Sequence, residues 1–135
     1  MPAPVDLLKS VPLFQNVPAK QLKAIADSFT ERRFSSGQEL TAEGGGAAGF
    51  FVIESGEAKV TIDGVERRTL GPGDHYGEIA LIDGGLRTAT ITASADGTAY
   101  GLTSWQFRPL VESHAEIAWP LLEAMAKRTR ELDSH

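Results

Sequence analysis

The chain has 135 residues, of which 41% are hydrophobic and 23% are charged. These values are typical of a chain that folds around one core and exclude wholesale disorder or a fibrous architecture. Its 13 basic and 18 acidic residues give a formal net charge of -5, the wrong sign for a protein that follows nucleic-acid phosphates. We therefore expect no DNA binding by this chain alone. The absence of cysteine excludes disulfides, thiolate catalysis and cysteine-ligated zinc.

The location of the protein is predicted from what its segments lack. The apolar runs are much shorter than the ~20 residues that span a bilayer, and the start "MPAPVDLLKSVPLF" lacks the charged beginning and apolar run of a signal peptide. We expect a cytoplasmic protein with no membrane association. The length predicts a single domain over residues 1–135.

The glycines divide the chain into three parts. All 14 lie between Gly37 and Gly101, which predicts an N-terminal helical segment at 1–33, strands and turns at 34–103, and C-terminal helices at 104–135. The stretch "VPAKQLKAIADSF" places apolar residues at helical spacing, with Pro18 near the first turn. This is one amphipathic helix, and we expect a shorter helix before it at about 5–9.

The middle part is predicted to form short strands. Ala58, Val60 and Ile62 alternate with polar residues and lead to the pair Asp63 and Gly64, a strong signal for a two-residue hairpin turn, after which "VERRTL" returns. Further strands are expected at 34–40, 49–53, 87–93 and 98–103, with turns at "GGGAAG", "GPGD" and "ADG". Many short strands at such spacing predict a sandwich or barrel.

The last part is predicted to form two helices. Ser104 is a good N-cap for a short helix through 111, and Ser113 with Glu116 has capping-box spacing for a second helix over about 115–132. Pro120 either starts or kinks that second helix. One of its faces carries Leu121, Met125, Arg128 and Leu132. The aromatic residues of this part are expected in the core rather than as a platform for stacking a base: Trp105, Phe107 and Trp119.

The stretch "YGEIALIDGGLRTATI", residues 76–91, carries an acid and an arginine that suit a nucleotide. Arg87 offers a planar fork of donors for phosphate oxygens, and Thr88 with the following backbone N–H adds donors to the same anion. Glu78 accepts hydrogen bonds, so its natural partner is a sugar hydroxyl, and Gly77 allows close approach of a ligand. The alternative is a simple salt bridge between Glu78 and Arg87.

This stretch resembles, almost residue by residue, the phosphate-binding cassette of the cyclic nucleotide-binding domains. The family pattern is an aromatic residue, Gly-Glu, an aliphatic residue, Ala or Gly, Leu, a variable loop, then Arg, Ser or Thr, and Ala, and here it spans 76–89. The resemblance extends to "VPLFQNVPAKQLKAIA" and "FFVIESGEAKV". It implies a mainly β fold with flanking helices, an antiparallel β-roll covered by a C-terminal lid helix.

The resemblance also implies roles for particular residues. Gly77 and Glu78 would meet the ribose 2′-hydroxyl, and the cyclic phosphate would be held by Arg87, Thr88 and Ala89. Ile79 and Ala80 complete the predicted ligand-binding set in the cassette, and "EIAL" could form a helical turn whose free N–H groups point at the anion. Arg128 would reach the ligand from the last helix.

The function implied is a sensor of a cyclic nucleotide, not an enzyme, with no cofactor or metal. We favour cAMP over cGMP as the ligand, and expect a homodimer or a partner protein to use the C-terminal helix. The chain ends at His135 without the helix-turn-helix of many bacterial members. Two alternatives stay open: a scaffold of the same fold that has lost its ligand and serves in structure or interaction, and a cupin-like metal site that uses His75, His114 and His135.

Overall fold

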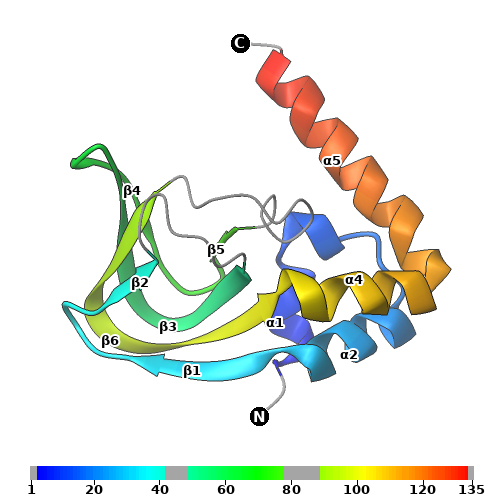
Figure 1. Cartoon of the computed structure of the whole chain (residues 1–135), viewed down its shortest axis with the longest axis horizontal. Coiled ribbons are helices and arrows are strands. Elements are labelled where there is room, and N and C mark those ends of the chain that lie inside the picture. The colour runs from blue at the N-terminus through cyan, green and yellow to red at the C-terminus, as the bar shows by residue number, and fades with distance from the viewer. Residues whose placement is uncertain (1–2, 42–48, 78–88, 134–135) are drawn as a thin grey trace.

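The protein is a curved antiparallel sheet with its helices gathered at one end, as a computed structural model shows (Figure 1). The structure describes residues 3–41, 49–77 and 89–133. Within these ranges the sheet has six strands in the order β1-β6-β3-β4, while β2 pairs with β6 and β5 with β3. The predicted mainly β roll with flanking helices is confirmed. The sheet is not closed, because β1 and β4 lie at its two edges.

Two long strands form the centre of the sheet. β3 (Gly49–Ile62) and β6 (Thr90–Thr103) are each 14 residues long and pair from Gly49↔Thr103 to Thr61↔Thr90. The shorter strands attach to this pair: β1 (Thr30–Phe34), β2 (Glu39–Thr41), β4 (Val65–Leu70) and β5 (His75–Tyr76). Because β3 and β6 are long and curved, one face of each strand lines the concave side of the sheet and the other faces away.

The hairpin predicted at Asp63 and Gly64 is confirmed. Ile62 pairs with Val65 across it, and both turn residues have positive φ, 54° and 77°. This is the turn conformation whose twist matches two antiparallel strands, and it strongly favours an Asp-Gly sequence.

Two of the predicted strands have other boundaries. The strand predicted at 34–40 is wrong, because β1 ends at Phe34 and a turn closed by the Gln38 N–H donating to the Ser35 carbonyl (3.0 Å) precedes β2. The strands predicted at 87–93 and 98–103 are parts of the single strand β6, although 87 and 88 lie outside the described residues. The "ADG" stretch is not a turn. Gly97 occurs there because a Cβ would clash with the Ser55 carbonyl on β3, so this glycine marks a close approach of two strands.

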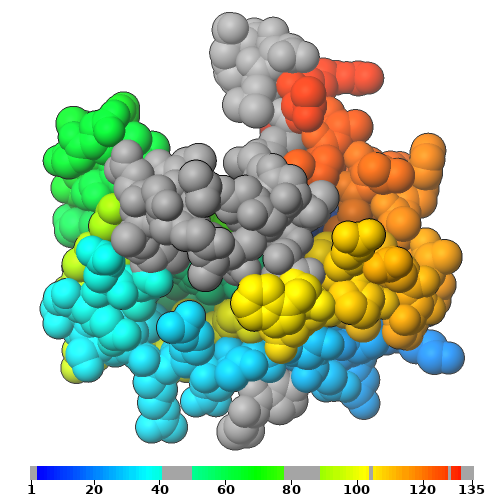
Figure 2. All heavy atoms as spheres, viewed as in Figure 1, coloured from blue at the N-terminus to red at the C-terminus, as the bar shows by residue number. Residues whose placement is uncertain are grey.

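The helices lie before and after the sheet. The N-terminal ones are α1 (Val5–Lys9), the 3₁₀ turn η1 (Pro12–Phe14) and α2 (Ala19–Ser28), so the helices expected at 5–9 and over "VPAKQLKAIADSF" are confirmed. The C-terminal ones are α4 (Ser104–Ser113), the 3₁₀ turn η2 (Ala115–Ile117) and α5 (Ala118–Asp133). Figure 2 shows the β3–β4 hairpin (green) and the C-terminal half of α5 (orange to red) on opposite sides of the molecule.

The predicted caps of the last helices are wrong. Thr103, not Ser104, is the N-cap of α4: its side chain accepts from the Gln106 N–H, and Gln106 accepts in return from the Thr103 N–H (3.0 Å). The capping box predicted for Ser113 and Glu116 does not form, because η2 begins after His114 with no side-chain cap. Pro120 lies in the first turn of α5, where its missing N–H removes no helical hydrogen bond, so it starts the helix rather than kinks it.

The apolar side chains form two clusters on the two faces of the sheet. We name the first the helical core, which joins all the helices to one face of β3 and β6; its strand members are Phe50, Val52, Tyr100 and Leu102. We name the second the roll interior, on the concave face: Phe34, Phe51, Ile53, Ala58, Val60, Leu70, Ala89, Ile91, Ala93 and Ala99, with Leu40, Ile62 and Tyr76 at its margin. Consecutive residues of β3 therefore enter different clusters.

The aromatic residues of the C-terminal helices divide between core and surface. Phe107 is 3% exposed and belongs to the helical core as predicted. Trp105 and Trp119 are each 68% exposed, so their predicted burial is wrong. Leu122, three residues after Trp119 on α5, is 59% exposed. In the described ranges, no helix has the length and apolar character needed to cross a membrane.

Candidate functional site

The predicted site residues are only partly within the described ranges. Glu78, Ile79, Ala80, Arg87 and Thr88 lie outside them, so their roles stay predictions. Arg128 belongs to α5, but its side chain also lies outside what the structure describes. Gly77 and Ala89, which flank the undescribed part of the cassette, are described.

Both ends of the cassette are anchored on the concave side of the sheet. Before it, β5 pairs with β3 through Phe51↔Tyr76 and Val52↔His75, and the rings of Phe51 and Tyr76 are 6.2 Å apart. After it, Ala89 is fully buried in the roll interior and leads into β6. The predicted ligand segment therefore begins and ends beside the same apolar surface.

Gly77 has a backbone reason to be glycine as well as the predicted functional one. Its φ is 99°, a conformation that a residue with a Cβ rarely adopts. The chain leaves β5 at this point, so the glycine sets the direction in which the cassette departs from the sheet.

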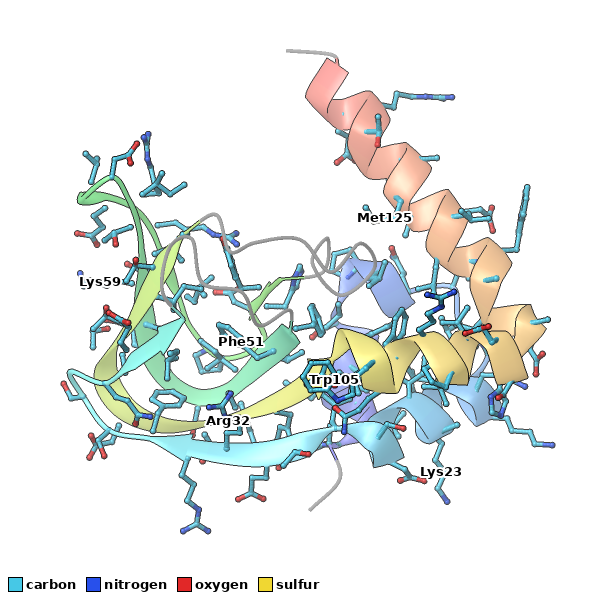
Figure 3. All side chains as sticks on the ribbon, viewed as in Figure 1. Lys23, Arg32, Phe51, Lys59, Trp105 and Met125 are labelled. Atoms are coloured by element: carbon cyan, nitrogen blue, oxygen red, sulfur yellow. The ribbon has the colours of Figure 1, made fainter. Side chains whose placement is uncertain are left out.

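A hollow of about 170 Å³ lies against the roll interior. Its lining combines side chains of the roll interior, two of the helical core and several polar ones: Phe34, Leu40, Phe51 and Ala99, then Phe50 and Leu102, then Thr30, Arg32, Arg33, Gln38, Thr103 and Gln106. Figure 3 shows Arg32 and Phe51 within the concave side, whereas Lys59 projects from the outside of the sheet. A hollow lined by both apolar and polar side chains can hold a small organic ligand.

The sequence did not indicate Arg32 as a site residue. It lies opposite Ala99 in the β1–β6 pairing, so both face the hollow, and it forms no ion pair within the described residues. Its neighbour Arg33 also lines the hollow and approaches Glu31 at 3.5 Å. The stretch "TERRF" alone does not say that its arginines lie beside the concave face. Knowledge of the pairing partner in β6 was needed.

The side chains with shifted pKa values described next do not line the hollow. The hydrogen bond and charge of Glu66 raise the pKa of Lys59, on the outside of the roll. Burial, and then the nearby Glu54 carboxylate, raises the pKa of the Tyr100 phenol, whose hydroxyl donates to Glu54 at 3.4 Å. Both groups contribute to the framework of the sheet.

The histidines of the cupin-like alternative have packing roles where they are described. His75 lies against Phe50 with ring centroids 5.7 Å apart, and the Nδ1 atom of His114 is 3.1 Å from the Leu110 carbonyl at the end of α4. His135 lies outside the described residues. Across the described ranges, no three His, Asp or Glu side chains gather as they would around a metal ion.

The comparison with protein families decides the identity of the fold. The model for the family described as "Cyclic nucleotide-binding domain" matches residues 31–114, more than half of the chain. The chain belongs to this family. The matched range includes both long strands, the whole cassette and all of α4.

Several family members resemble the chain over most of its length. It is 31% identical over 109 residues to a cAMP-dependent protein kinase regulatory subunit of Yarrowia lipolytica, covering 78% of this chain and 29% of that protein. It is 32% identical over 115 residues to the cGMP-dependent 3′,5′-cGMP phosphodiesterase A of Dictyostelium discoideum, covering 83% of this chain and 13% of that protein. The chain thus matches less than a third of either curated relative.

A solved structure resembles almost the entire chain. The N-terminal domain of a transcriptional regulator from Streptomyces coelicolor superimposes with a TM-score of 0.86 and 30% identity, over 96% of both chains. The protein is therefore a cyclic nucleotide-binding regulatory domain by family and by fold.

Proposed function

We propose that the protein is a non-catalytic sensor of cAMP that transmits binding through α5. The observation that carries the proposal is the complete cassette sequence, "GEIAL" followed by "RTA", joined at Gly77 and Ala89 to strands whose residues Tyr76 and Ala89 pack in the roll interior. In the proposed complex Arg87, Thr88 and Ala89 hold the cyclic phosphate, while Gly77 and Glu78 meet the ribose 2′-hydroxyl. Ile79, Ala80 and Arg128 complete the site.

The choice between cAMP and cGMP depends on how the site treats the base. The relatives named above include one described as cAMP-dependent and one as cGMP-dependent. The Thr88 hydroxyl suits a phosphate oxygen of either ligand and also the amino group of a syn guanine. Parallel titrations with cAMP and cGMP test the choice directly, and tighter binding of cGMP would replace the ligand while retaining the site.

The central experiment is a thermal shift with a site variant. Ligand at about 100 times its Kd should add about 2.7 kcal/mol to the free energy of unfolding. Arg87→Ala should lose about 1.5–3 kcal/mol of binding, because it removes a charge-assisted bidentate contact. Arg67→Ala is the matched control, since this exposed arginine lies on β4 and should leave binding unchanged.

The second candidate function is a vacant scaffold that serves in structure or interaction. Trp119 and Leu122 are exposed on α5, which would suit a homodimer or a partner protein. A flat melting curve with both cAMP and cGMP at millimolar concentration would favour this candidate. Wild-type affinity in Arg87→Ala would show instead that the phosphate lies elsewhere.

The proposed output is a change in the position of α5. Leu121 and Met125 of this helix pack on the helical core, and the helix contacts η1 of the N-terminal segment. Hydrogen exchange should show greater protection with cAMP both at 78–89 and at about 121–132. Protection confined to the cassette would leave the nucleotide site intact and remove α5 as the output element.

A further inference from the structure

The hollow beside β1 is rich in hydrogen-bond donors. Arg32 and Arg33 of β1, Gln38 before β2 and Gln106 of α4 all line it. The described residues that line it include no aspartate and no glutamate, although the whole chain has a net charge of -5. The hollow is therefore a positively charged region of an acidic protein, and local positive charge of this kind attracts anions.

Both glutamines leave their amide nitrogens available. The Gln38 Oε1 atom accepts from the Ser35 N–H at 3.1 Å, and the Gln106 Oε1 atom accepts from the Thr103 N–H at 3.0 Å. Because a backbone N–H needs an acceptor, these contacts identify the oxygen end of each amide. Neither amide nitrogen donates to another described residue. Each glutamine can therefore donate two N–H groups to a ligand in the hollow.

Arg32 is the main charged donor of the hollow. Its Cδ atom lies 3.5 Å from the position that a Cβ on Gly101 would occupy, so its stem lies over the part of β6 where glycine leaves space. Its guanidinium forms no ion pair within the described residues, and it lies on the concave side in Figure 3. Arg33 approaches Glu31 at 3.5 Å, but its side chain is 85% exposed, and such surface pairs are weak.

The rest of the lining is mostly apolar and sets the size of the ligand. The roll interior contributes Phe34, Leu40, Phe51 and Ala99. The volume of about 170 Å³ is close to that of an engineered apolar cavity of about 150 Å³ that binds benzene. A single aromatic ring can therefore cover this apolar surface, whereas an inorganic anion would leave it in contact with water.

We propose that the hollow is a second ligand site, separate from the cassette, for a small carboxylate whose apolar body has the size of one aromatic ring. The carboxylate accepts from the guanidinium of Arg32, whose planar fork of donors matches its two oxygens. The amide N–H groups of Gln38 and Gln106 are the further donors, and the ring lies against Phe34 and Phe51. None of these residues belongs to the cassette, so the site is independent of the proposed function.

NMR titration of the full chain with benzoate tests the proposal. Benzoate should shift the amide signals of β1 and of the start of α4. Arg32→Gln removes the charge and should weaken benzoate binding at least about tenfold, because a hydrogen bond between two charged groups is lost. Arg67→Gln is the matched control on β4, the other edge strand, and should bind like the wild type. Benzamide, which is neutral, and inorganic phosphate, which has no apolar body, should each bind the wild type at least about tenfold more weakly than benzoate.

The outcomes separate this site from the proposed function. Equal binding of benzoate and benzamide to the wild type would overturn the recognition of charge, and this comparison does not depend on how a variant folds. Benzoate binding that survives Arg32→Gln but is lost in Arg87→Ala would place the anion in the cassette and overturn the second site. If benzoate binds through Arg32 while no cyclic nucleotide binds, the second site is retained and the proposed function is wrong.

Discussion

The two faces of the same strands carry very different apolar clusters. In the helical core, large rings pack edge to face. The ring centroid of Phe14 is 5.8 Å from that of Phe50 and 6.5 Å from that of Phe29, and the centroids of Phe29 and Phe50 are 6.1 Å apart. In the roll interior, four of the buried residues are alanines: Ala58, Ala89, Ala93 and Ala99. The filled face stabilises the fold, while the face with four alanines is the one beside which we place the ligand.

This difference in packing explains how a domain of this size can contain a binding cavity and still be stable. Close packing of large side chains contributes most of the stabilisation that burial provides. Here that packing is on the helical side, where all the helices meet β3 and β6. The concave side can then remain incompletely filled without unfolding the sheet.

The largest effect should come from truncating a ring on the filled face. Phe50→Ala should reduce the free energy of unfolding by about 3–5 kcal/mol, since it removes a ring contacted by Phe14, Phe29 and His75. Phe51→Ala should cost less, because this ring is 9% exposed, against 1% for Phe50, and lies among the smaller side chains of the roll interior. Urea denaturation of both variants measures the difference. Equal losses of unfolding free energy in the two variants would show that the two faces of the sheet do not differ in their packing.

A smaller effect should come from enlarging an alanine. Ala26→Leu on α2, in the filled helical core, should cost about 1–3 kcal/mol through overpacking. Ala99→Leu adds the same atoms beside the hollow and should change stability by less than about 1 kcal/mol while weakening cAMP binding. Thermal unfolding and calorimetry on the pair provide the measurements. If Ala99→Leu destabilised the protein more than Ala26→Leu does, the hollow would not have room for the added atoms.

The smallest effect concerns the junction between β6, which carries both clusters, and α4, which belongs to the helical core. Thr103→Ala removes the N-cap of α4 and should cost about 1 kcal/mol. Ser113→Ala is the control, because η2 has no side-chain cap, and it should change stability by less than about 0.5 kcal/mol. A larger loss of stability in Ser113→Ala would indicate that the capping box predicted for Ser113 and Glu116 forms in the protein.

Much of the fold was predictable from local patterns. The hairpin at Asp63 and Gly64, the helix at 5–9 and the helix within "VPAKQLKAIADSF" each depend on residues close together in the chain, and all three are confirmed. The cassette is also local, since its pattern lies within 76–89. The family was therefore identifiable from one stretch, whereas the lining of the hollow was not.

The sequence by itself determined those features that neighbouring residues encode: turn conformations, amphipathic helices and the cassette pattern. The tertiary structure alone decided which side of a strand or helix is buried. Arg32 faces the hollow because it pairs with Ala99, and Gly97 is required because Ser55 passes beside it. Trp105 and Trp119 remain exposed because no described element covers them. Burial depends on contacts between residues distant in sequence, and hydrophobicity at one position does not specify its partner.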